Sequence, residues 1–125
     1  MKLRIHGNSV RLRLSQSEVS RFIEYGVVTS RLEFPGDNVL TYSLVSDPDA
    51  TRIQAELNGS IVIRVPAVKG TTWANGDEVG LSSECAVSGD RVLKILVEKD
   101  FTCLVPRAGE DDADTFPHPK AAGAQ

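Results

Sequence analysis

Residues 2–14 read KLRIHGNSVRLRL, two short runs in which apolar and basic residues alternate on either side of a Gly7-Asn8-Ser9 break. Alternation with a period of two is typical of β-strands, because successive side chains point to opposite faces of a sheet. Three intervening residues are too few for a parallel crossover, so the two runs must pair as an antiparallel hairpin. With Gly7-Asn8 as a two-residue turn, Ile5 pairs with Val10 and the apolar side chains share one face.

The same register predicts a ladder of cations on the other face of this hairpin. Arg4 lies opposite Arg11 and Lys2 lies opposite Arg13, and directly opposed like charges are unfavourable by roughly a few tenths of a kcal/mol per pair. One interpretation is a site for a small anion or an acidic protein partner, because guanidinium groups match phosphate and carboxylate groups. The candidate ligand-binding residues are then Arg4, His6, Asn8, Ser9, Arg11 and Arg13. The alternative interpretation is structural, with water or carboxylates such as Glu33, Glu98 and Asp100 neutralising the cations.

Length and composition predict one small domain. The chain has 125 residues, 41% of them hydrophobic and 25% charged. We expect a single globular β-rich domain over residues 1–105 and a mobile acidic tail, rich in Pro, Ala and Gly, over residues 106–125. The formal net charge of −3 argues against a general binder of polyanions. The chain has no signal-like or membrane-spanning stretch, and Cys85 and Cys103 form no disulfide framework, so a cytoplasmic protein is expected.

Turn residues divide the rest of the domain into further strands. Strands are expected near residues 27–34, 39–45, 52–57, 61–65, 78–87 and 91–98. A helix is expected over about 17–25, because Ser15 and Glu18 have the spacing of a capping box and Gly26 is a natural stop. One helical turn is expected around 68–74. The predicted fold class is α+β, mainly antiparallel β, with about seven to nine strands in hairpins that form a sheet or a barrel-like body, and one short N-terminal helix.

The register of a second hairpin follows from its apolar faces. A two-residue loop at Asn58-Gly59-Ser60 would set Ile53 opposite Arg64. A three-residue loop instead pairs Leu57 with Ile61, which keeps apolar residues on one face, with a bulge absorbed at Gly59 or Ser60. We therefore predict the longer loop.

A second cluster of reactive residue types lies near the C-terminus. A thiol, carboxylates and an imidazole are ligand types for a transition metal, which makes a metal- or thiol-dependent enzyme a second alternative. The candidate metal ligands are Cys103, Asp111, Asp112, Asp114 and His118. The alternative interpretation of the acidic run is a solubilising tail. No known catalytic motif occurs, so we assign no catalytic residue and no cofactor, and we expect a non-enzymatic protein.

Two blocks of sequence carry a resemblance that extends over nearly the whole chain. They are LRIHGNSVRLRLSQSEV at residues 3–19 and ILVEKDFTCL at residues 95–104, with Arg107, the acidic run and Phe116-Pro117 after them. Together they resemble a family of small bacterial proteins of unknown function. This resemblance implies a complete stand-alone protein, and it brings no activity, cofactor or partner.

A local resemblance involves two shorter motifs. Gly7-Asn8-Ser9, followed by Val10-Arg11-Leu12, is similar to the start of swapped-hairpin transcription factors and antitoxin DNA-binding domains, and Gly76-Asp77-Glu78-Val79 is similar to a later motif of those proteins. The resemblance implies a dimer whose Arg-bearing strands contact DNA, which would assign that role to Arg11 and Arg13. Here residues 27–73 lie between the two motifs, whereas the family's domain is compact.

Overall fold

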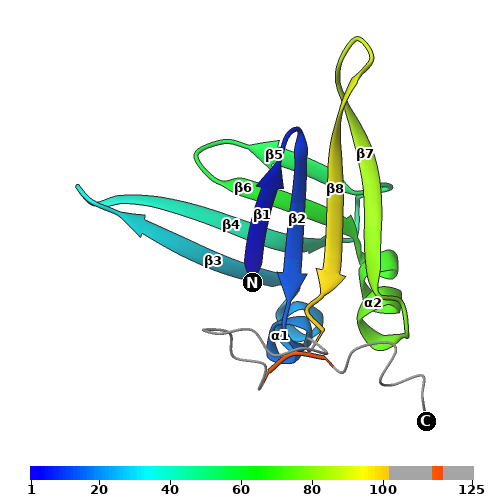
Figure 1. Cartoon of the computed structure of the whole chain (residues 1–125). Helices are drawn as coiled ribbons and strands as arrows, with labels where there is room; N and C mark the ends of the chain where they lie inside the picture. Colours follow the sequence, from blue (N-terminus) through cyan, green and yellow to red (C-terminus); the bar gives the residue numbers. More distant parts are fainter. Residues whose placement is uncertain (102–113, 117–125) are drawn as a thin grey trace.

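The computed structural model describes residues 1–101 and 114–116, and within them the chain forms eight strands and two helices (Figure 1). In chain order these are β1 (Lys2–His6), β2 (Ser9–Leu14), α1 (Gln16–Tyr25), β3 (Val27–Phe34), β4 (Asn38–Asp47), β5 (Gln54–Leu57), β6 (Ile61–Pro66), α2 (Ala67–Asn75), β7 (Gly80–Ser88) and β8 (Arg91–Lys99). Neither of these helices is long and apolar enough to cross a membrane.

The strands form two four-stranded sheets. Sheet A has the order β1-β2-β8-β7, and sheet B has the order β3-β4-β6-β5. In Figure 1 the strands of sheet A run crosswise to those of sheet B, and both helices lie at one end of sheet A. The facing sides of the two sheets and the buried sides of the helices enclose one hydrophobic core.

The α+β, mainly β class predicted from the sequence is confirmed, with three corrections. The two central strand pairs, β2 with β8 and β4 with β6, are parallel, while the outer pairs are antiparallel hairpins. β2 and β8 are distant in the chain, and β5 lies between β4 and β6, so neither parallel pair is a hairpin that a local turn pattern could indicate. Within the described residues the sheets stay open and form no barrel. The expected single turn near residues 68–74 is a complete second helix, α2, of nine residues.

The chain consists of two halves with the same order of elements. The first half is β1-β2-α1-β3-β4 and the second half is β5-β6-α2-β7-β8. Each half gives one hairpin to sheet A and its other hairpin to sheet B. The parallel pair at the centre of each sheet therefore joins a strand of one half to a strand of the other. The two halves exchange hairpins, and neither builds a whole sheet alone.

Both predicted hairpin registers are confirmed. In the first hairpin Ile5 pairs with Val10 and Arg4 pairs with Arg11. In the second hairpin Leu57 pairs with Ile61, so the loop has three residues as predicted. Gly59 has a φ of +73°, a left-handed conformation that favours glycine, and this lets the longer loop turn without strain.

The two helices meet through aromatic side chains at corresponding positions. Phe22 lies seven residues after the N-cap Ser15 of α1, and Trp73 lies seven residues after the N-cap Pro66 of α2. Their ring centroids are 6.1 Å apart with an interplanar angle of 72°, a T-shaped contact in the core. Gly70 makes this approach possible, because a Cβ atom there would lie 2.9 Å from the Phe22 ring.

Three residues of the predicted tail are described, and they pack on the body. The Phe116 backbone N–H donates to the Asp100 carbonyl at 2.7 Å, and the Gln16 N–H donates to the Asp114 carbonyl at 3.0 Å. The rings of Phe101 and Phe116 are 5.9 Å apart. The rest of the predicted tail, 106–113 and 117–125, lies outside the described residues.

Candidate functional site

A basic face lies on the outer side of sheet A, and we define it by Lys2, Arg4, His6, Arg11, Arg13 and Lys94. The register places Arg4 beside Arg11 on β1 and β2, and it places Lys94 of β8 beside Ser9 of β2. Because Val10, Leu12 and Leu14 point into the core, the alternate residues of β2 must point outward. The cationic ladder predicted from the sequence is therefore present.

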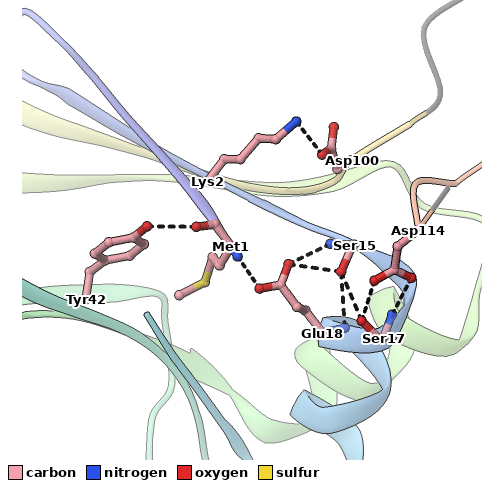
Figure 2. Close-up of polar contacts among 8 residues, drawn as sticks. All are labelled: Met1, Lys2, Ser15, Ser17, Glu18, Tyr42, Asp100 and Asp114. Atoms are coloured by element: carbon pink, nitrogen blue, oxygen red, sulfur yellow. Dashed lines mark hydrogen bonds and ion pairs between the residues drawn. The ribbon is translucent and has the colours of Figure 1, made fainter. Parts of the chain in front are cut away.

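Two carboxylates at the end of sheet A neutralise three of these cations. Glu98 accepts a hydrogen bond from Arg11 Nε and forms an ion pair with Arg11 Nη2. Its Oε1 also lies 3.0 Å from Arg13 Nε, which is not aligned for a hydrogen bond. Asp100 lies 2.9 Å from Lys2 Nζ (Figure 2) and 3.7 Å from Arg13 Nη2. Glu98 and Asp100 are both buried. Two of the carboxylates considered from the sequence, Glu98 and Asp100, therefore lie within ion-pair distance of Lys2, Arg11 and Arg13.

Arg4, His6 and Lys94 differ from that group. All three are exposed, and none makes an ion pair or a side-chain hydrogen bond with the residues that the structure describes. Glu84 is the cross-strand neighbour of Lys94 but lies beyond ion-pair distance. Glu33, the third carboxylate considered from the sequence, lies on sheet B, 3.9 Å from Arg31. The basic face thus keeps three groups able to meet an outside anion.

Two of the predicted ligand-binding residues have side chains engaged within the turn. The Asn8 side-chain amide donates to the Val92 carbonyl at 2.8 Å, which fixes the turn to β8. The Ser9 hydroxyl donates to the His6 carbonyl at 2.6 Å, which closes the turn itself. These contacts position the hairpin and explain why Asn and Ser stand there.

A hollow of about 390 Å³ lies beside the basic face, over β2, β8 and β7. Arg11 and Lys94 contribute cations to its lining, Ser82 contributes a hydroxyl, Glu84 a carboxylate and Leu96 an apolar floor. Arg11 has five N–H donors, of which Glu98 engages the Nε and Nη2 groups, so further donors remain for a ligand. The hollow has the size and the polar groups to hold a small anion.

The start of β1 is fixed by a network of polar contacts (Figure 2). The Met1 ammonium is ion-paired with Glu18, and the same carboxylate accepts from the backbone and hydroxyl of Ser15. Burial by itself would raise the pKa of Glu18, but the hydrogen bonds from the Met1 ammonium and from Ser15 outweigh it and lower that pKa. The Tyr42 hydroxyl donates to the Met1 carbonyl at 2.8 Å, so the start of β1 lies over β4.

Lys99 is buried on the opposite side of β8. Its Nζ donates to the Gly76 carbonyl at 2.7 Å and lies 6.0 Å from the Trp73 ring centroid and 5.6 Å from that of Phe116. Burial lowers the pKa of Lys99, while the nearby Asp77 and Glu78 carboxylates act in the other direction. An ammonium group at the end of α2 stabilises that helix terminus, which accounts for the position of this residue.

The predicted metal cluster is mostly outside the described part of the chain. Cys103, Asp111, Asp112 and His118 belong to the segments that the structure does not describe. Asp114 is described, and its carboxylate accepts from the Ser17 backbone at 3.2 Å and from the Ser17 hydroxyl. Among residues 1–101 and 114–116 no group of three metal-ligating side chains occurs.

Lys94 is the member of the basic face that sequence reasoning missed. The hairpin around Ser88-Gly89-Asp90 already predicts that Lys94 faces outward if Ile95 is buried. Its place beside Ser9 depends on the parallel pairing of β2 with β8, which has no signal in either strand alone.

The fold and the basic face define an α+β, mainly β protein of two crossed sheets, with a basic surface on which Arg4 and Lys94 have no carboxylate partner among the described residues. The chain belongs to the family of unknown function DUF7009, whose model matches residues 1–120. This agrees with the resemblance to a family of unknown function that the sequence blocks indicated. Neither the curated proteins nor the solved structures gave a significant match.

Proposed function

We propose that this protein is a non-enzymatic binding module that recognises anionic groups, phosphate or carboxylate, on the basic face of sheet A. The observation that carries the proposal is Arg4, an exposed arginine beside Arg11 with no carboxylate partner among the described residues. A guanidinium group offers paired N–H donors to a phosphate or carboxylate. A bound anion would also relieve the repulsion between the two opposed arginines.

The positions of four basic residues support a site rather than a single contact. Arg11 and Lys94 line the hollow, and Arg4 and His6 follow on the neighbouring strand β1. Glu98 holds the Arg11 side chain in place, so less side-chain entropy is lost when a ligand binds it. The site residues that we propose are therefore Arg4, His6, Arg11 and Lys94.

The test is an amide NMR titration with citrate and with inorganic phosphate, at ionic strength held constant with NaCl. We expect saturable shifts for residues of β1, β2 and β8, and affinity that is about fivefold weaker in Arg4→Gln. Arg31→Gln is the matched control, because Arg31 is an exposed arginine on sheet B. Shifts that are absent from β1, or that weaken equally in both variants, would exclude the site.

The exchange of hairpins between the two halves supports a second candidate, a DNA-binding regulator of the swapped-hairpin type. Each half contributes one hairpin to each sheet, so a single chain would hold the arrangement that such domains build from two subunits. Residues 27–73 separate the two motifs because Gly7-Asn8-Ser9 belongs to the first half and Gly76-Asp77-Glu78-Val79 to the second. In this candidate Arg11 and Arg13 would face the phosphates.

A gel-shift assay with random-sequence duplex DNA tests the second candidate. We expect retardation at low salt that falls steeply as salt is added, and weaker retardation in Arg11→Ala than in Arg31→Ala. A protein that does not retard DNA even at low salt would remove the candidate.

A further inference from the structure

β1 is an edge strand. In sheet A it pairs with β2 on one side, and its other side carries no strand of the described chain. Such an edge presents unpaired backbone N–H and C=O groups, which can take up another extended segment. What could pair with it depends on the side chains of β1 and on the surface beneath the position beside β1.

The β3–β4 hairpin extends past β1 in Figure 1. The hydrogen bond from Tyr42 to Met1 places the start of β1 over Tyr42 of β4. Leu40 lies two residues before Tyr42 on β4, on the same face of the sheet, and it pairs with Leu32 of β3. These residues lie about 7 Å beyond Tyr42 toward the hairpin tip, whereas neighbouring strands in a sheet are about 4.8 Å apart.

The part of sheet B that projects beyond β1 is apolar, and no strand among residues 1–101 and 114–116 covers it. Leu32 and Phe34 are each 50% exposed, although alternation places them on the same face as the buried Val28. At the other end of β1, Ile5 is also exposed, and it borders an apolar hollow of about 230 Å³ between the tips of the β1–β2 and β5–β6 hairpins. A strand added beside β1 would therefore have apolar side chains beneath it.

The opposite side of β1 carries only cationic and polar groups, Lys2, Arg4 and His6. A second copy of this chain that paired through its own β1 would bring those cations against one another. Charged edge strands resist self-pairing for this reason. The same cations would favour a strand whose outward side chains are carboxylates.

We propose that an extended acidic segment of a partner protein adds to sheet A as a strand alongside β1. Its alternate side chains are carboxylates, which face Arg4 and its neighbours, and apolar groups, which cover Leu32, Leu40 and Phe34. The inference deepens the proposed function, on which it rests, by assigning the anionic groups to a polypeptide. Backbone hydrogen bonds supply affinity and the two side-chain rows supply specificity.

The corresponding edge of sheet B supports the choice of an acidic partner for β1. β5 holds the same place in the second half that β1 holds in the first. Its outward residues are Gln54 and Glu56, so it lacks cations that would select carboxylates. The two edges therefore provide an internal comparison within one protein.

The experiment uses the full chain and a capped peptide in which Glu and Val alternate, with binding followed by calorimetry and amide NMR. The comparison peptides replace every Glu by Lys, or carry N-methyl groups along one backbone edge. Leu32→Glu is the test variant. Val68→Glu is its matched control, because Val68 is an apolar residue on α2 that is 80% exposed. Circular dichroism checks the folding of each variant, and Phe34→Glu replaces Leu32→Glu if that variant unfolds.

We expect the Glu–Val peptide to shift the amides of residues 2–6 and to bind at least about tenfold more tightly than either comparison peptide. Leu32→Glu should weaken it about tenfold, and Val68→Glu less than about twofold. If citrate binds as proposed, but neither Leu32→Glu nor backbone methylation changes the affinity of the peptide, then strand addition is wrong and the anion site stands. If citrate fails to bind and the Lys–Val peptide binds equally well, the basic face does not recognise anions and both proposals fail.

Discussion

The hairpins β1–β2 and β5–β6 hold the same place in the two halves, but within the described part of the chain only β1–β2 carries an arginine without a carboxylate partner, Arg4. Each has an arginine two residues before a helix N-cap, Arg13 before Ser15 and Arg64 before Pro66. Each arginine reaches an aspartate after or at the end of the parallel neighbouring strand. Arg13 lies 3.7 Å from Asp100, and Arg64 lies 3.6 Å from Asp47.

The difference lies on the edge strands. Glu56 on β5 lies 2.9 Å from Arg64 and neutralises it. Arg4 of β1 corresponds to Glu56 of β5. Each of them pairs with the residue two positions before the arginine that reaches an aspartate. The Arg–Asp pair therefore belongs to the fold, which repeats it. The presence of Arg4 on β1, where β5 carries Glu56, marks the hairpin where we expect a ligand.

The largest expected effect tests whether the contact between Phe22 and Trp73 joins the two halves in the core. Trp73→Ala removes the larger of the two ring partners and should lower the free energy of unfolding by about 4–5 kcal/mol. Phe22→Ala should cost about 3–4 kcal/mol, because the same contact is lost from the other side. Urea unfolding measures both. A loss below about 1 kcal/mol in either variant would mean that the helix contact does not join the halves.

The next prediction compares the ion pairs of Glu98 on sheet A with the ion pair of Glu56 on sheet B. Glu98→Gln leaves Arg11 and Arg13 without their shared carboxylate, and should cost about 2 kcal/mol after allowance for the partial exposure of both arginines. Glu56→Gln removes an exposed ion pair and should cost less than about 0.5 kcal/mol. Equal losses in the two variants would contradict the distinction between a buried and an exposed network.

The smallest effect concerns the two helix starts and depends on pH. The folded-state pKa of Glu18 is lowered, so its stabilising effect is complete above the ordinary value of 4.5 and is lost as pH falls through the lower folded pKa. Unfolding followed over acidic pH should show a loss on the order of 1 kcal/mol that Glu18→Gln abolishes. The N-cap of α2, Pro66, makes no side-chain cap hydrogen bond, so that helix start should contribute no such dependence. An unchanged acid profile in Glu18→Gln would refute the assignment.

Several features were predictable because they depend on near neighbours in the chain. The hairpin turn at Gly7-Asn8 fixed which faces of β1 and β2 match, and the capping box at Ser15 and Glu18 located the start of α1. The cationic ladder followed from the same register. The helix α2 was underestimated, because its N-cap is a proline without a side-chain cap and a glycine lies inside it.

What the sequence alone determined about this protein was its hairpins, their registers, the first helix and the sign of the charge on each strand face, because turn geometry and side-chain alternation act over a few residues. The tertiary structure alone decided which cations are neutralised. Arg11 and Glu98 are 87 residues apart in the sequence and meet because β2 and β8 pair in parallel, which the sequence of neither strand indicates. The hairpin exchange that brings them together is held by the shared core, in which Phe22 of one half packs on Trp73 of the other.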